Sequence, residues 1–150
     1  MKEINLNELR FYPGKFNWMS DSINMQLSHL LEDKELVNGL PSVAYTDEEF
    51  WKIECDTVLA ENWVFVGFVH EFKKLGDVLP ITVGGQPLVL VRNKNGNILA
   101  FHNVCSHRCL KLVDRPTNVG KTIRCPYHSW SYDLDGNLLA SPHFGGTNNH

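Results

Sequence analysis

The chain has 150 residues, which suits one domain with enough length to bury a hydrophobic core. Hydrophobic residues make up 43% of it and charged residues 21%, as in an ordinary globular protein, and the formal net charge is −3. This mildly acidic balance gives no reason to expect nucleic acid or an anionic membrane as a partner. The longest strongly apolar stretch, Trp63 to Val69, is far too short to cross a bilayer, and the N-terminus lacks the apolar core of a signal peptide.

Residues 1–42 form a polar extension, and we assign residues 43–150 to the main domain. Within the extension, four apolar residues lie at helical spacing: Ile23, Leu27, Leu30 and Leu31. This amphipathic helix either covers an apolar patch of its own chain or contacts another subunit. Thr46 and Glu49 have the spacing of a capping box, which predicts a second helix with Thr46 as its N-cap.

The hydrophobic period then changes from that of a helix to that of a strand. The predicted strands are Trp63 to His70, Asp77 to Val83, Gln86 to Arg92, Ile98 to Val104 and Thr122 to Cys125. Gly84-Gly85 and Asn95-Gly96 are expected to form tight turns, and a further hairpin is expected across Asp135-Gly136. Many short strands joined by Gly and Asn turns predict a mainly β, antiparallel domain that follows N-terminal helical segments.

Two short segments carry the chemistry of this chain. Cys105-Ser106-His107 and Cys125-Pro126-Tyr127-His128 each supply one thiolate and one imidazole. This donor set suits a 2Fe–2S cluster in which two Cys bind one iron and two His bind the other. The alternatives are a structural zinc site and coincidence. Zinc sites usually open with two Cys spaced two to four residues apart, whereas here each segment mixes Cys with His.

The residues around these ligands resemble a known family. Phe101 to Arg108 and Cys125 to Gly136 are similar to the Rieske domain of ring-hydroxylating oxygenases, in the N-terminal part of their large (alpha) subunits. The resemblance covers roughly residues 42 to 145. It implies a Rieske-type β-sandwich with the cluster-binding loops at one end. It also implies that the four ligands are Cys105, His107, Cys125 and His128.

The chain departs from the family pattern at two positions. Cys109 and Ser129 stand where the family usually has Gly, and Gly in such loops permits a positive φ. We expect Cys109 to be a free thiol near the cluster, because the position that would hold its disulfide partner is Tyr127. Tyr132 matches a hydroxyl donor to sulfur in high-potential relatives, but Trp130 replaces a second donor, so the potential should lie near the low end of the Rieske range.

The resemblance also implies partners. The parent enzyme would take electrons from a reductase or ferredoxin and pass them to a mononuclear Fe(II) in a C-terminal catalytic domain, of the same or a neighbouring subunit of a homotrimer. No His/His/carboxylate set for that iron follows Trp130 in this sequence, so this segment has no catalytic residues of its own. The alternative function is a standalone Rieske ferredoxin that only carries electrons. Cysteine usage favours a reducing cytoplasm.

Overall fold

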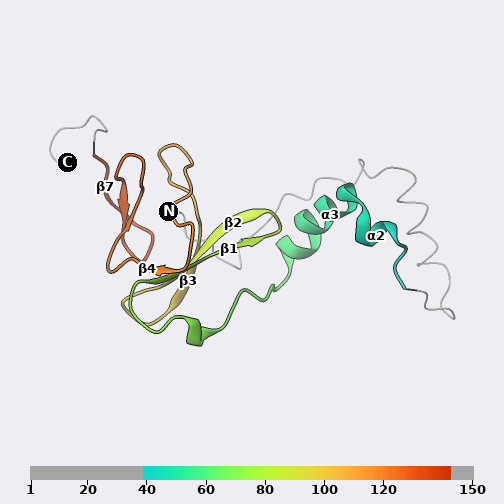
Figure 1. The fold of residues 1–150 in the computed structure, drawn as a ribbon, viewed down its shortest axis with the longest axis horizontal. Helices are drawn as coiled ribbons and strands as arrows, with labels where there is room; N and C mark the ends of the chain where they lie inside the picture. The colour runs from blue at the N-terminus through green and yellow to red at the C-terminus, as the bar shows by residue number, and fades with distance from the viewer. Residues whose placement is uncertain (1–38, 143–150) are drawn as a thin grey trace. The chain divides into compact units, whose positions relative to one another are not determined.

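The computed structural model describes residues 39–142 of the chain (Figure 1). These residues belong to two compact units, 39–63 and 64–142, and each unit is described by itself. The amphipathic helix expected between Ile23 and Leu31 lies outside the described residues.

The first unit is helical. It consists of α2 (Val43–Thr46), α3 (Glu48–Glu54) and a π-helical turn, η1 (Cys55–Leu59). The predicted N-cap was wrong by one residue: the carboxylate of Asp47 accepts the backbone N–H of Phe50 at 2.9 Å, while the Thr46 hydroxyl donates to the carbonyl of Ser42. Thr46 already ends α2, so its side chain points back along that turn, and Asp47 caps the next helix. In the part of the chain that the structure describes, no helix is long and apolar enough to span a membrane.

The strand predicted from Trp63 to His70 was also wrong. Residues 63–68 are irregular, and a 3₁₀ turn, η2 (Val69–Glu71), follows them. Phe65 and Val69 are 73% and 72% exposed, although alternation favoured a half-buried strand. A strand needs a partner whose backbone groups it can bond, and none of the described strands pairs with this segment.

The second unit contains two antiparallel sheets, and the first has the strand order β3-β2-β1-β4. Its strands are β1 (Asp77–Val83), β2 (Gln86–Arg92), β3 (Ile98–His102) and β4 (Thr117–Asn118). β1 and β2 have the predicted bounds. Gly84 and Gly85, both with positive φ, turn the chain between them, so Val83 pairs with Gln86 (Figure 1). β3 ends two residues before the predicted Val104, and the short β4, which sequence did not suggest, pairs with the start of β1.

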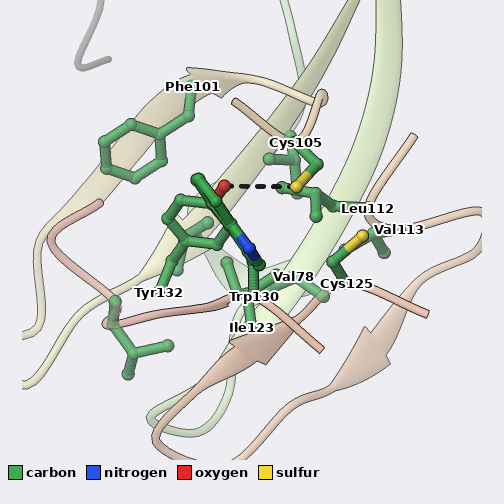
Figure 2. Close-up of a cluster of buried hydrophobic side chains, with 12 residues drawn as sticks. Val78, Phe101, Cys105, Leu112, Val113, Ile123, Cys125, Trp130 and Tyr132 are labelled. Carbon is green, nitrogen blue, oxygen red and sulfur yellow. Dashed lines mark hydrogen bonds between the residues drawn. The ribbon is translucent and has the colours of Figure 1, made fainter. Parts of the chain in front are cut away.

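The second sheet has the order β5-β6-β7 and is built from β5 (Ile123–Arg124), β6 (Ser131–Tyr132) and β7 (Leu138–Ala140). The expected hairpin across Asp135-Gly136 joins β6 to β7. Buried side chains from both sheets form one core. The first sheet contributes Val78, Val89, Val91 and Phe101, and the second contributes Ile123 and Tyr132. Figure 2 shows Val78, Phe101, Ile123 and Tyr132 within this core. The domain is therefore the expected β-sandwich, and both Cys-containing segments lie in loops at strand ends.

Candidate metal centre

The first Cys–His segment is a closed hairpin loop. Val104 and Lys111 form a bridge at its base. Inside it, the Cys105 N–H donates to the carbonyl of Leu110 at 2.8 Å, and the Cys109 N–H donates to the carbonyl of Cys105, also at 2.8 Å. Cys105 thus donates one backbone hydrogen bond and accepts the other, and these two bonds hold residues 105–109 in a single tight turn.

The second segment repeats this geometry. Arg124 pairs with Ser131 at the base, where β5 meets β6. The Cys125 N–H donates to the carbonyl of Trp130 at 2.8 Å, and the Ser129 N–H donates to the carbonyl of Cys125 at 3.1 Å. Two separate stretches of the chain thus form the same loop, each beginning with a cysteine. The histidine is the third residue of the first loop and the fourth of the second.

Each loop ends on a residue in the left-handed region. Cys109 has φ = 54° and Ser129 has φ = 64°, and they are the only non-glycine residues with positive φ among residues 39–142. The loops therefore keep the geometry for which the family pattern uses Gly, although both side chains carry a Cβ. Each such residue costs on the order of 1 kcal/mol relative to Gly.

The loops bring the two imidazoles together and bury both thiols. The ring centroids of His107 and His128 are 4.7 Å apart, with an angle of 65° between the ring planes. Both rings are half-buried, whereas Cys105 and Cys125 are 1% and 3% exposed. Two sulfur donors thus lie inside the domain, and two nitrogen-bearing rings lie closer to its surface.

The surroundings of Cys105 favour its thiolate form, which is the form that binds iron. Burial raises the pKa of Cys105, but hydrogen bonds outweigh it, so that the pKa lies below its ordinary value. The donors are first the Tyr132 hydroxyl, then the backbone N–H of His107 and the Cys125 thiol. Burial raises the pKa of Tyr132, which keeps its hydroxyl protonated as a donor.

The Tyr132 hydroxyl connects the second sheet to the first loop. Its oxygen lies 3.3 Å from the sulfur of Cys105, the contact marked by the dashed line in Figure 2. It also accepts the backbone N–H of Ser106 at 3.0 Å. Tyr132 is fully buried, so water does not compete for this hydroxyl. The tyrosine expected from the sequence therefore lies within hydrogen-bond distance of the Cys105 sulfur, and its hydroxyl also donates to the Ser106 hydroxyl at 3.3 Å.

Each histidine ring packs against an aromatic ring of the second loop. The Trp130 indole stacks on His107, with centroids 4.8 Å apart and planes within 7° of parallel, and it is 7% exposed. The Tyr127 ring lies 3.7 Å from His128 between centroids and is 57% exposed.

A buried asparagine holds the chain that follows the first loop. The side chain of Asn103 is 0% exposed, and its oxygen accepts the backbone N–H groups of Leu112 (3.2 Å) and Val113 (3.0 Å). Its amide group donates to the Val113 carbonyl at 2.7 Å. Asn103 lies within the motif from Phe101 to Arg108, but the sequence alone assigned it no role. A polar residue inside an apolar run was the available signal.

The other histidines stay apart from these loops where the structure describes them. His70 is exposed in η2, and His102 is half-buried in β3; His29, His143 and His150 lie outside the described residues. Cys109 is a free thiol, as expected, and it is exposed. Arg108 is exposed as well.

The donor set fits a binuclear cluster. Among residues 39–142, no group of three or more His, Cys, Asp or Glu side chains is arranged to hold a metal ion. A 2Fe–2S cluster with mixed ligation asks for only two protein ligands on each iron. A pair of buried thiols and a pair of adjacent imidazoles, presented by two loops of the same geometry, meets that requirement.

Comparisons with known proteins also indicate a 2Fe–2S cluster. The sequence profile of the Rieske [2Fe-2S] domain matches residues 62–150. The glycine betaine monooxygenase oxygenase subunit of Chromohalobacter salexigens is 36% identical over 110 residues, which cover 73% of this chain and 25% of that protein. The benzene 1,2-dioxygenase subunit alpha of Pseudomonas putida is 35% identical over 99 residues, which cover 66% of this chain and 22% of that protein.

Solved structures show the same likeness. A quaternary ammonium Rieske monooxygenase, described in connection with carnitine oxidation and inter-subunit electron transfer, is 32% identical with a TM-score of 0.64, over 69% of this chain and 28% of that one. A naphthalene 1,2-dioxygenase is 32% identical with a TM-score of 0.63, over 67% and 23%. The chain spans about a quarter of the length of the curated relatives that it matches. With a profile match over more than half of its residues, the chain belongs to the Rieske [2Fe-2S] domain family.

Proposed function

We propose that Cys105 and Cys125 bind one iron of a 2Fe–2S cluster and that His107 and His128 bind the other. The observation that carries this assignment is the repeated loop geometry, which buries both thiols and brings the two imidazole rings to 4.7 Å. When bound, such a cluster accepts and releases one electron. The chain supplies two thiols, two imidazoles and a Tyr132 hydroxyl 3.3 Å from the Cys105 sulfur.

The role that these features support is electron delivery within a Rieske oxygenase alpha subunit. The relatives and solved structures named above are oxygenases or oxygenase subunits, which favours this role over that of a standalone ferredoxin. The chain would receive electrons from a reductase or ferredoxin and deliver them to a mononuclear iron in a catalytic domain. Insertion of oxygen into an organic substrate would take place at that iron, in a trimer like those that the family resemblance implies.

Three finer assignments accompany this proposal. The division of the chain at residue 42 stays a prediction. We place the protein in a reducing compartment, the cytoplasm, which is supported by the free thiols of all four cysteines. We also propose a potential near the low end of the Rieske range, because Trp130 stands where a second hydroxyl donor to sulfur would be.

The test is electron paramagnetic resonance of the full chain after reconstitution with iron and sulfide and reduction with dithionite. We expect a rhombic signal whose average g-value corresponds to mixed Cys/His ligation. Replacing either ligand histidine, as in His107→Ala or His128→Ala, should abolish it. His70→Ala is the matched control, since His70 is exposed and outside both loops, and it should leave the signal unchanged.

Two results would overturn the assignment. A colourless protein that binds zinc and contains no acid-labile sulfide would identify a structural zinc module. A rhombic signal that survives both His107→Ala and His128→Ala would place the nitrogen ligands elsewhere in the chain.

A further inference from the structure

The residue after His128 is held in place by its neighbours. Ser129 has φ = 64°, a conformation that residues with a Cβ adopt at a cost. The Arg124 guanidinium donates to the Ser129 hydroxyl at 2.9 Å, and the Ser131 hydroxyl donates to the Ser129 carbonyl at 3.0 Å. Both contacts come from the strands at the base of the loop, one from β5 and one from β6. Hydrogen bonds therefore fix both the side chain and the backbone of Ser129.

The equivalent position in the first loop provides an internal comparison. Cys109 has nearly the same φ, 54°, and closes the same turn. Its thiol is exposed. At the base of this loop, Val104 has no polar side chain, and the Lys111 ammonium pairs with Asp114 at 3.6 Å. A hydroxyl with a cation opposite it is thus particular to the loop that carries His128.

Arg124 also occupies a distinctive position relative to the proposed ligands. It directly precedes Cys125, and it contacts Ser129, which directly follows His128. One side chain thus spans the base of a loop that holds one sulfur and one nitrogen ligand. The guanidinium carries a permanent positive charge.

We propose that Arg124 is a positioning residue for His128, which it orients by holding Ser129 in the left-handed conformation, and that its charge favours the reduced state of the site. This inference rests on the ligand set proposed above. In the second loop, the Arg124–Ser129 pair takes the place of the conformational freedom that a glycine would supply.

The electrostatic part follows from a count of charges. Two ferric ions, two sulfides, two thiolates and two neutral imidazoles sum to zero, and the uptake of one electron leaves one negative charge. A fixed positive charge nearby stabilises that added negative charge more than the neutral state, so it raises the reduction potential. Arg124 is exposed, so salt should weaken this effect.

The positioning part is tested by a double-mutant cycle. Arg124→Met is made in the natural sequence and in the Ser129→Gly background, and each protein is examined as the reconstituted full chain. In the natural sequence, Arg124→Met should shift and broaden the rhombic signal and lower the melting temperature of the apo-protein. In the Ser129→Gly background, Arg124→Met should change neither the rhombic signal nor the melting temperature, because glycine adopts a positive φ without steric cost.

The chain supplies a matched control. Cys109→Gly removes the same strain from the first loop without touching the Arg124 contact. The effects of Arg124→Met should therefore be as large in the Cys109→Gly background as in the natural sequence. Equal effects of Arg124→Met in the Ser129 and Ser129→Gly proteins would overturn the positioning role.

The charge is tested separately by redox titration at low salt. Arg124→Met should lower the midpoint potential both in the natural sequence and in the Ser129→Gly background. Arg124→Lys, which keeps the positive charge, should leave the midpoint potential unchanged. Lys121→Met, which removes another exposed cation outside the loop, should shift the potential less. An unchanged potential in Arg124→Met would refute the electrostatic role. If the natural sequence gave no rhombic signal at all, the ligand assignment would fail, while the apo-protein melting temperatures would still decide whether Arg124 holds Ser129.

Discussion

Replacing Asn103 with alanine should destabilise the domain strongly, because its side chain bonds only to buried backbone. The carboxamide makes three hydrogen bonds, at 2.7, 3.0 and 3.2 Å, and is 0% exposed. Asn103→Ala leaves two N–H groups and one carbonyl without these partners. Each unsatisfied buried group costs about 1–3 kcal/mol, so the sum is about 3–5 kcal/mol after some relaxation. The total free energy of unfolding of a small domain is only about 5–15 kcal/mol.

The chain offers a control with equally many side-chain hydrogen bonds. The exposed Asn118 side chain donates to Leu75 O and Asp77 Oδ1 and accepts from Gly120 N, at 2.9, 2.7 and 2.9 Å. Water can replace these partners, so Asn118→Ala should cost no more than about 1 kcal/mol. The comparison isolates burial from the number of hydrogen bonds.

The assay is urea unfolding of the apo-protein, followed by the fluorescence of its tryptophans, of which Trp130 is buried in the core. We expect the unfolding midpoint of Asn103→Ala to fall steeply with an unchanged slope, and that of Asn118→Ala to change little. Cluster incorporation should fall in Asn103→Ala as well, since Asn103 fixes the chain that leaves the first loop. Losses of the same size in the two variants would refute the argument.

Three further predictions concern the site, the pH response and the fold. Tyr132→Phe removes the hydroxyl that lies 3.3 Å from the Cys105 sulfur. Losing about 1 kcal/mol of stabilisation of the reduced site should lower the midpoint potential by about 40 mV. An unchanged potential in the redox titration would mean that the hydroxyl does not stabilise the reduced site. The Asn118 side chain and a backbone N–H donate to Asp77 and lower its pKa, so the ionised carboxylate stabilises the fold above its unfolded pKa of about 3.9. The natural protein should therefore be more stable than Asp77→Asn at neutral pH, and this difference should disappear as the pH falls through the lowered native pKa. A difference that persists in acid would contradict this. Gly76→Ala should destabilise the domain by more than about 3 kcal/mol, because a Cβ there would lie 2.0 Å from the backbone oxygen of Gly120. A Cβ at Gly120 would have no atom within 4 Å, so Gly120→Ala should cost only about 1 kcal/mol for its positive φ. Equal unfolding midpoints of the two variants would show that the backbone relaxes to accommodate the Cβ at residue 76.

The sequence by itself determined the features that depend on neighbouring residues. The alternation in β1 and β2 and the Gly84-Gly85 turn specify a hairpin locally, because side-chain period and turn conformation are set within a few residues. The two ligand segments could be recognised for the same reason, since each places Cys and His within one turn. The replacement of Gly by Cys109 and Ser129 was also visible, but it left the geometry of the two loops open, and the structure shows a positive φ at both positions.

Tertiary structure decided what depends on distant partners. The apolar run after Trp63 alternates like a strand, but it stays irregular because strand formation requires an unpaired edge that only the fold can provide. Thr46 and Asp47 are both good caps, and the position of α2 decided between them. The burial of Asn103 and the contact from Arg124 to Ser129 were likewise invisible beforehand, because burial and hydrogen bonding across a loop arise only once the chain has closed on itself.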